Sequence, residues 1–131
     1  MKKVLIVESK VADARALKEC LREAGFANPS ATLKSGTEAQ RHLADRDQDC
    51  IVLLNISQAP DGDGMEFLDW IHSQSYYKDL LVIAVGERSQ LRAVVEACER
   101  GAHTFLIKPV HAEDLKTLAG RYPDHWARAR E

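Results

Sequence analysis

The sequence is poor in cysteine and in aromatic residues, and neither sign of charge dominates it. The three cysteines among its 131 residues, Cys20, Cys50 and Cys98, lie far apart without a CxxC pair, which excludes a disulfide framework and favours a reduced, cytoplasmic protein. Lys and Arg number 18 and Asp and Glu number 20, so the chain has no basic stripe for nucleic acid. The first apolar run, Val4–Val7, is too short for a signal peptide or a membrane span. The histidines form no ligand pair on a helix, and no metal site is predicted.

Apolar residues are plentiful enough for one hydrophobic core. They make up 45% of the chain, too many for a disordered protein. No linker, repeat or low-complexity segment divides the sequence. We therefore predict a single domain over residues 1–122, followed at 123–131 by an extension of the last helix or a flexible tail.

Short apolar runs alternate with segments of helical periodicity along the whole chain. The runs are continuous in apolar character, as parallel strands covered on both faces are, and they span 4–7, 50–54, 80–85 and 105–107, with a more polar one at 31–34. Between them, apolar residues recur every three or four positions, in the segments 17–24, 37–46, 65–71, 91–98 and 115–122. The pattern predicts an α/β fold: a doubly wound, three-layer (βα)5 sandwich around a five-stranded parallel sheet.

Turn and cap residues mark the ends of several predicted helices. Gly25 and Gly101 follow two of them where a left-handed backbone is favoured, and Thr37 and Ser89 stand where N-caps are expected. The two aspartates of the turn at 60–64 are expected to bind backbone N–H groups rather than to act in acid–base catalysis.

Polar residues end the predicted strands at the edge of the sheet where open α/β proteins bind ligands. In chain order they are Glu8 and Ser9, Asn55, Gly86 and Glu87, and Lys108 with Pro109. An acid, an amide and a lysine would converge there. For an arbitrary α/β domain, ordinary polar loop positions are the favoured interpretation, and spacing alone does not overturn it.

Four motifs, in order, resemble the receiver domains of bacterial response regulators, from about Lys3 to Leu118. They are an opening strand with an acidic pair at 3–9, the strand of the phospho-accepting aspartate at 50–56, a Pro-to-Asp-Gly turn at 60–64, and a Gly-Ala pair before a strand ending in Lys-Pro at 101–109. The resemblance implies a flavodoxin-like, CheY-like domain with strand order 2-1-3-4-5 that serves two-component or phosphorelay signalling.

The departures from this family fall on the positions that it uses for phosphoryl chemistry. Asn55 occupies the position of the acceptor aspartate, and a neutral amide cannot form an acyl phosphate. Ser9 replaces the second acid of the acidic pocket, so Glu8 alone remains charged and its charge is cancelled by Lys108. We expect Mg²⁺ binding to be weak or absent, with no other cofactor, and we expect Lys108 to pair with Glu8 or Asn55.

The switch positions of the family also differ. Gly86 stands where a hydroxyl would sense the phosphoryl group, and Phe105 keeps the aromatic ring of the second switch position but has no hydroxyl. One extra residue in the segment 57–59 lengthens the loop that follows the acceptor position. The bond preceding Pro109 is commonly cis in the family.

These departures indicate a pseudo-receiver: a phosphorylation-independent protein–protein interaction module and not an enzyme. Its expected partners are a histidine kinase, a phosphotransfer domain or a downstream effector, without membrane contact. The resemblance implies a docking face over 91–98, 105–107 and 115–122, which also offers a homodimer interface; its candidate residues are Arg92, Glu96, Arg100, His103 and Lys116. The alternative is a sensor of a small anion or metabolite in the crevice at the carboxyl ends of the strands.

Overall fold

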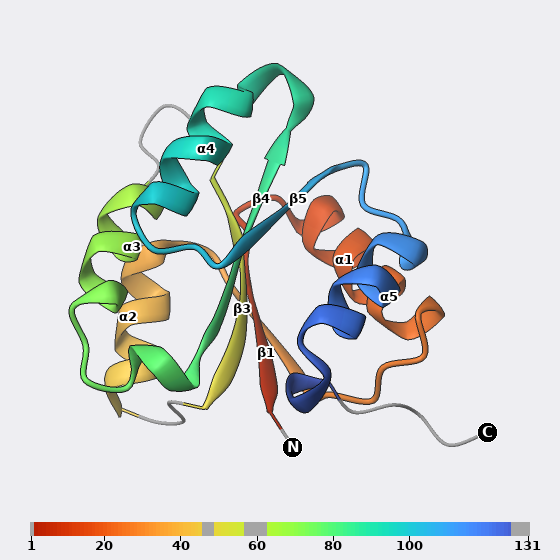
Figure 1. Ribbon diagram of the computed structural model, residues 1–131, viewed down its shortest axis with the longest axis horizontal. Helices are drawn as coiled ribbons and strands as arrows, with labels where there is room; N and C mark the ends of the chain where they lie inside the picture. The colour runs from red at the N-terminus through yellow and green to blue at the C-terminus, as the bar shows by residue number, and fades with distance from the viewer. Residues whose placement is uncertain (1, 46–48, 57–62, 127–131) are drawn as a thin grey trace.

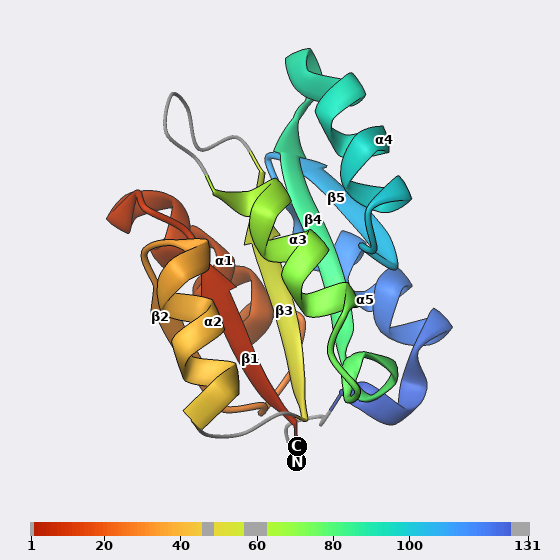
Figure 2. The same ribbon diagram turned by 90° about the vertical axis from the view of Figure 1, so that its left-hand side faces the viewer.

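The fold is known from a computed structural model that describes residues 2–45, 49–56 and 63–126. Five parallel strands form one sheet in the order β2-β1-β3-β4-β5, as predicted. The strands are β1 (Lys3–Val7), β2 (Ser30–Leu33), β3 (Cys50–Asn55), β4 (Leu81–Glu87) and β5 (Thr104–Lys108). Figure 2 shows them side by side behind one layer of helices.

Five α-helices cover the two faces of the sheet. They are α1 (Val11–Glu23), α2 (Gly36–Asp45), α3 (Gly64–His72), α4 (Leu91–Glu99) and α5 (Ala112–Arg121). Three short 3-10 helices are η1 (Tyr77–Asp79), η2 (Arg88–Gln90) and η3 (Pro123–His125). Helices α1 and α5 lie on one face of the sheet and α2, α3 and α4 on the other (Figure 1). The predicted three-layer architecture is confirmed.

The central strands are buried on both faces, which explains their continuous apolar runs. Every residue of β3 except Asn55 is fully shielded from solvent, and so are Val4 to Val7 of β1. Side chains alternate between the two faces of a strand, so each strand contributes to two core layers. Full burial of one Leu, Ile or Val side chain contributes about 1.5–3 kcal/mol, and these strands therefore account for much of the stability of the fold.

The helix ends agree with the glycine predictions but not with the predicted N-caps. Gly25 and Gly101 have φ values of 85° and 132°, in the region that disfavours other residues. The predictions for Thr37 and Ser89 are wrong: Thr37 lies in the first turn of α2, and Ser89 lies within η2, ahead of α4. Sequence patterns locate the end of a helix only to within one or two residues, and the predicted caps are displaced by that amount.

One aspartate of the predicted turn at 60–64 lies just before α3 and accepts hydrogen bonds from the backbone at the start of α2. Asp63, just before α3, accepts hydrogen bonds from the N–H groups of Gly36 and Thr37 at 2.7 and 2.8 Å and from the Thr37 hydroxyl at 2.9 Å. It therefore caps the start of α2. Burial alone would raise the pKa of Asp63, but these hydrogen bonds outweigh it and hold the pKa below its ordinary value. The other aspartate, Asp61, lies outside the described residues.

The described part of the C-terminal segment packs against the domain. Helix α5 ends at Arg121, and η3 follows directly. The Trp126 ring lies against Phe26 with ring centroids 4.8 Å apart, while 127–131 lie outside the described residues. No helix in the part of the chain that the structure describes is long and apolar enough to cross a bilayer.

Candidate functional site

The site begins where the apolar rows of the sheet end. The core layer beside α1 and α5 takes from the strands Val4, Ile6, Ile51, Leu53, Leu81, Ile83, Val85 and Leu106. Because side chains two positions apart share a face, the same rows continue into Glu8, Asn55, Glu87 and Lys108. The polar residues therefore gather at the carboxyl ends of the strands, next to α1.

Glu8 is the centre of this group. It is 1% exposed, and Asn55 beside it is 4% exposed. The Asn55 Nδ2 group donates to both carboxylate oxygens of Glu8, at 2.8 and 2.9 Å. Lys108 Nζ donates to Oε1 at 3.1 Å, and the Lys10 backbone N–H donates to Oε2 at 3.1 Å. A buried carboxylate needs such donors, and here they come entirely from the chain itself.

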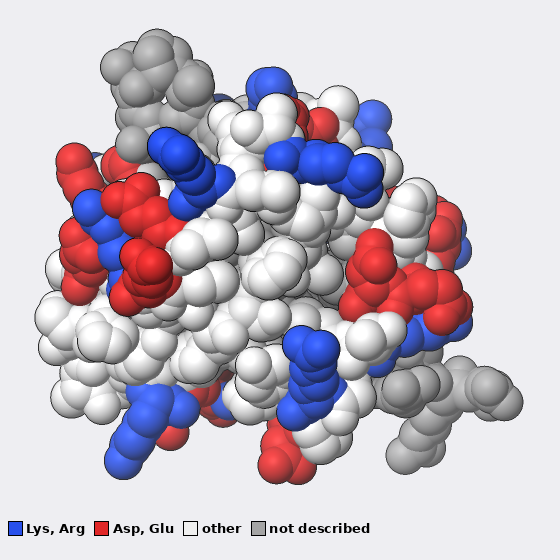
Figure 3. Space-filling view, turned by 45° about the horizontal axis from the view of Figure 1, so that its top comes forward, with Lys and Arg blue, Asp and Glu red and all other residues white. Residues whose placement is uncertain are grey.

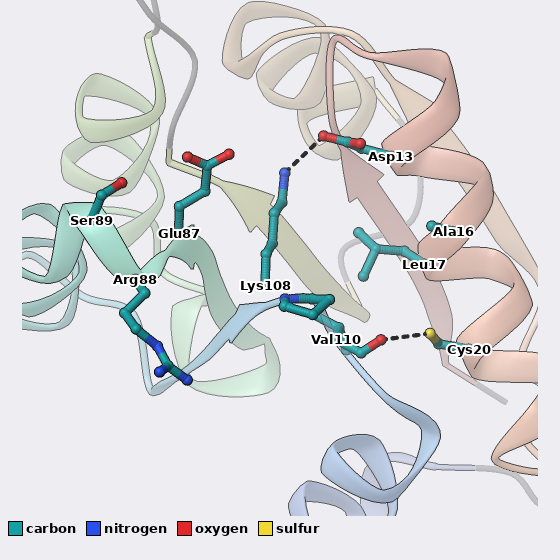
Figure 4. Close-up of a pocket in the computed structure, with 10 residues that line it drawn as sticks. Asp13, Ala16, Leu17, Cys20, Glu87, Arg88, Ser89, Lys108 and Val110 are labelled. Carbon is teal, nitrogen blue, oxygen red and sulfur yellow. Dashed lines mark hydrogen bonds and ion pairs between the residues drawn. The ribbon is translucent and has the colours of Figure 1, made fainter.

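Lys108 joins Glu8 to helix α1. Its Nζ lies 3.0 Å from Asp13 Oδ2, in addition to the contact with Glu8, and Figure 4 shows the extended Lys108 side chain pointing toward Asp13. Burial alone would lower the pKa of Lys108, but the hydrogen bonds from the ammonium to Asp13 and Glu8 raise it above its ordinary value. Lys108 is therefore charged at neutral pH. The peptide bond between Lys108 and Pro109 is cis.

The expected pairing of Lys108 with Glu8 is confirmed, whereas the contact with Asp13 was not predicted. In the sequence Asp13 is one acidic residue in the first turn of a helix, a common position for favourable interaction with the helix dipole. No pattern distinguishes it there. Its role follows from the way α1 packs over the end of β5.

The residues present do not fit a magnesium ion. Mg²⁺ requires carboxylate oxygens that are free to coordinate it, but both oxygens of Glu8 already accept hydrogen bonds. Ser9 is exposed and carries no charge. Within the described ranges, no group of three or more His, Cys, Asp and Glu side chains is placed to hold a metal ion.

The space beside Gly86 is closed by its neighbours. A Cβ atom at this position would lie 2.8 Å from Val94 Cγ2 and 3.2 and 3.3 Å from two carbons of Ile56. These distances are shorter than normal carbon–carbon contacts. A hydroxyl-bearing side chain at position 86 therefore does not fit without movement of Ile56, which follows β3, or of Val94 on α4. The sequence showed the absent hydroxyl but not the filled space.

The charged candidates for a docking face lie on or beside α4 and α5. Arg92 and Glu96 are exposed on α4, and Lys116 is exposed on α5. Arg100 follows α4 and forms ion pairs with Asp69 and Glu96, both at 3.2 Å. Exposed pairs of this kind contribute little stability, so these side chains can exchange partners at little cost.

His103 lies apart from the other candidates, in the turn before β5. Its Nδ1 accepts a hydrogen bond from the Val82 backbone N–H at 3.0 Å, and its ring stacks on Tyr77 with centroids 5.0 Å apart. Burial of the ring, and repulsion from the nearby His125 and His72, lower the pKa of His103. These contacts place His103 at the amino-terminal end of β4, opposite to the end that carries Glu8.

An exposed apolar patch on α4 and β5 was missed by the sequence analysis. Leu91, Val95 and Phe105 are 50%, 56% and 48% exposed, and with Val94 and Cys98 they line a hollow of about 370 Å³. The predicted apolar stripe of 91–98 implied that all of its members face the core. Within 91–98 only Val94 and Ala97 are buried, because the helix turns Leu91 and Val95 toward β5 and solvent.

Charge around the site is mixed. Viewed toward the carboxyl ends of the strands, separate basic and acidic groups surround a largely uncharged centre (Figure 3). No single sign covers this face. The view agrees with the formal net charge of −2 for the whole chain and gives no surface suited to steering a polyanion.

The fold and the row of polar strand ends define a CheY-like α/β signalling domain. The chain belongs to the response regulator receiver domain family, which it matches over residues 4–119. It is 29% identical over 114 residues to chemotaxis protein CheY of Pseudomonas aeruginosa, covering 87% of this chain and 90% of CheY. Receiver domains interact with kinases and effectors in two-component systems.

The similarity extends to a much longer protein and to a solved crystal structure. The two-component response regulator ORR21 of Oryza sativa subsp. indica is 29% identical over 116 residues, which are 88% of this chain but only 16% of that protein. The crystal structure of the receiver domain of NtrX from Brucella abortus has 26% identity and a TM-score of 0.77, covering 92% of this chain and 98% of that one. The receiver unit is therefore shared by proteins of very different length.

Proposed function

We propose that this receiver domain is a pseudo-receiver: a phosphorylation-independent protein-interaction module of two-component signalling, without enzymatic activity and located in the cytoplasm. The observation that carries the proposal is the hydrogen bonding of Asn55 to Glu8. The residue at the acceptor position is a neutral amide, and its N–H groups are bound to the neighbouring carboxylate. An amide oxygen is a poor nucleophile toward phosphorus and leaves no stable acyl phosphate.

The rest of the site supports the same conclusion. Lys108 is already bound by Glu8 and Asp13, so it offers no unpaired ammonium to an incoming phosphoryl group. Gly86 has neither a hydroxyl nor room for one. The donors and acceptors of the site are paired with one another, so its side chains stay in one arrangement. A change in the conformation of the domain then has to come from a partner that binds one conformation more tightly than the other.

The surface that we propose for docking is the apolar patch of Leu91, Val95 and Phe105, flanked by Arg92 and Glu96. Exposed apolar residues that gather beside charged ones are typical of protein contacts. The proposed partners are a histidine kinase, a phosphotransfer domain or a downstream effector, or a second copy of this chain. Arg100 and Lys116 would lie at the rim of such a contact.

The alternative, a sensor of a small anion or metabolite in the crevice itself, has less support. A ligand site needs open volume, and the side chains of Glu8, Asn55 and Lys108 occupy the crevice and bind one another. An anion there would also lie against the buried carboxylate of Glu8.

The test is a pair of ¹H–¹⁵N NMR titrations of the whole chain, first with Mg²⁺ and then with beryllofluoride. We expect no saturable shifts around Asn55 in the native protein. The Asn55→Asp, Ser9→Asp double variant serves as the positive control and should respond to Mg²⁺, because it restores the acids of the pocket. Saturable shifts in the native protein at the same concentrations would refute the pseudo-receiver.

The docking surface is tested separately by charge insertion. Val95→Asp places a carboxylate in the patch, and Val11→Asp places one at a valine on α1 that is even more exposed, 69% against 56%. If the second copy is the partner, sedimentation velocity should detect a dimer that Val95→Asp abolishes and Val11→Asp preserves. A dimer lost equally in both variants would argue against this surface.

A further inference from the structure

One edge of the sheet is open along β5. Among the described residues β5 pairs only with β4, and Figure 2 shows it as the last strand of the sheet. An edge strand directs the N–H and C=O groups of alternate residues away from its neighbour. The five residues of β5 therefore offer hydrogen-bonding groups to a further strand.

A groove runs along this open edge, between β5 and α5. Its volume is about 550 Å³, and the consecutive residues 104–109 all line it. Consecutive side chains of a strand point to opposite faces of the sheet, so a groove that touches all of them lies against the backbone edge and not over one face. The opposite wall comes from α5, through Asp114, Thr117, Leu118 and Arg121. The groove therefore follows the direction of an extended peptide.

Cations outnumber carboxylates in this groove. Its lining contains three cations and one carboxylate: Arg88, Lys108, Arg121 and Asp114. The Lys108 ammonium is balanced from outside the groove, since it is bound by Glu8 and Asp13. Asp114 is bound as well, because its Oδ2 atom accepts the His111 backbone N–H at 2.9 Å at the start of α5. The positive charge that is left for a partner belongs to the two arginines.

These arginines lie toward opposite ends of the groove. Arg88 follows β4 at the carboxyl end of the strands, and its guanidinium points away from Glu87 and Lys108 (Figure 4). Arg121 is the last residue of α5, which follows β5 and runs back toward the amino-terminal end of that strand (Figure 1). Within the described ranges neither guanidinium forms an ion pair. Each is available to a carboxylate of a partner.

From the open edge and this charge distribution we propose that β5 accepts an extended, acidic segment of a partner protein as a sixth strand of the sheet. Main-chain hydrogen bonds to β5 would supply the pairing, and carboxylates at the two ends of the segment would meet Arg88 and Arg121. A strand advances about 3.3 Å per residue, so a segment as long as β5 spans the groove. The inference rests on the proposed function, because it names the chemistry of a protein partner.

Other occupants match the groove less well. A second copy that paired through β5 about a two-fold axis would run antiparallel, so Arg88 of one copy would lie near Arg121 of the other, and like charges would face each other. A small anion would reach one arginine only and leave the backbone edge unpaired. An acidic extended segment satisfies both the backbone groups and the two guanidinium groups.

The probe for the test is a capped seven-residue peptide, Asp-Val-Thr-Val-Thr-Val-Asp, titrated into the whole ¹⁵N-labelled chain. We expect saturable shifts at 104–108 and slower amide exchange at alternate residues of β5, because their N–H groups become hydrogen-bonded. The same peptide with lysine at both ends should bind about tenfold more weakly or less. A peptide with proline in place of the central valine should lose affinity to the same extent, because proline cannot donate to the pairing.

Two outcomes of these titrations would overturn the proposal. Equal binding of the aspartate and lysine peptides would contradict the role of the arginines. Saturable shifts without slower exchange in β5 would show that the peptide docks through side chains and does not add a strand.

Charge reversal locates the segment on the protein. The double variant Arg88→Glu, Arg121→Glu should raise Kd for the aspartate peptide about tenfold or more and improve binding of the lysine peptide. The matched control is Arg15→Glu, Arg41→Glu, which changes the net charge equally at exposed positions of α1 and α2 outside the groove. The control should leave Kd within about twofold of the native value. Equal losses in both variants would refute the assignment to this groove.

Two further comparisons separate this inference from the proposed function. Val95→Asp alters the apolar patch on α4 and should leave peptide binding unchanged, whereas a loss would place the peptide on that patch. Absence of peptide binding, with no response to Mg²⁺ and beryllofluoride around Asn55, would refute the added strand alone. Saturable shifts around Asn55 together with peptide binding to β5 would refute the pseudo-receiver alone.

Discussion

The side-chain amide of Asn55 bridges both oxygens of the Glu8 carboxylate, with donor–acceptor distances of 2.8 and 2.9 Å. An amide satisfies a buried anion through its N–H groups, whereas a carboxylate of nearly the same shape would repel it. The residue at position 55 therefore decides whether the site is complete without a metal ion or requires one.

The first prediction concerns Asn55→Asp. Two carboxylates in hydrogen-bonding contact should lower the free energy of unfolding at neutral pH by about 1–3 kcal/mol. Urea denaturation without divalent ions measures the loss. Added Mg²⁺ should stabilise the variant by binding its folded state and leave the native protein unchanged. Equal stabilisation of both proteins would contradict the role assigned to Asn55.

The ion pair of Lys108 with Glu8 gives the second prediction. The Glu8 side chain is 0% exposed and the Lys108 side chain 18% exposed, and removal of one partner of a buried pair costs about 3–5 kcal/mol. Lys108→Met should show that loss in urea denaturation. Lys116→Met removes an exposed pair with Glu113 and should change stability by less than about 0.5 kcal/mol. Similar values for the two variants would mean that the network contributes no stability.

The third prediction tests the closed space at Gly86. Gly86→Ser forces its Cβ into Val94, 2.8 Å away, and overpacking of this kind costs about 1–3 kcal/mol. Gly120→Ser on α5 is the control, because no atom lies within 4 Å of a Cβ there. Adding Val94→Ala to Gly86→Ser should recover part of the melting temperature relative to Val94→Ala alone. No recovery would contradict the steric explanation.

The fourth prediction is a pH dependence from His103. Its folded-state pKa lies below the ordinary 6.5, so the unfolded chain binds the proton more readily. Stability should be constant above that ordinary value, fall as the pH drops toward the folded-state pKa, and level off below it. Melting temperatures from about pH 8 to about pH 5 measure the slope, and His103→Gln should reduce it.

Two other histidines bear on this pH experiment. Burial of His125 and the positive charge of Lys2 also lower the pKa of His125, so some slope should remain after His103→Gln. His111→Asn is the control, because Asn can still cap the start of α5 from this exposed position. A slope unchanged in His103→Gln, or reduced equally in His111→Asn, would show that the titrating group lies elsewhere.

Much of the fold was predictable because it depends on local periodicity. Continuous apolar runs at 50–54 and 80–85 require burial on both faces, and that burial is available in a parallel sheet. Gly101 could be assigned a left-handed backbone because a side chain there is strained. The N-caps of α2 and α4 were misplaced, since neither a 3-10 turn ahead of a helix nor a capping carboxylate from a distant residue, such as Asp63, leaves a local pattern.

The candidate site divides in the same way. The convergence of Glu8, Asn55 and Lys108 follows from sequence, because parallel strands end at one edge and residue type decides the chemistry there. Three features were not predictable: the ion pair of Lys108 with Asp13, the closed space around Gly86, and the exposure of Leu91 and Val95. Each depends on how a helix is rotated and seated on the sheet.

The sequence by itself determined the order of strands and helices, the five-stranded parallel sheet and the neutral amide at position 55, because periodicity and residue chemistry are properties of the chain. Only the tertiary structure decided that Glu8 is satisfied by internal donors, that Lys108 is shared with Asp13, and that Leu91 and Val95 are exposed. These features arise from contacts between residues up to 100 positions apart. Their geometry is set by close packing of helices on the sheet, which no local pattern encodes.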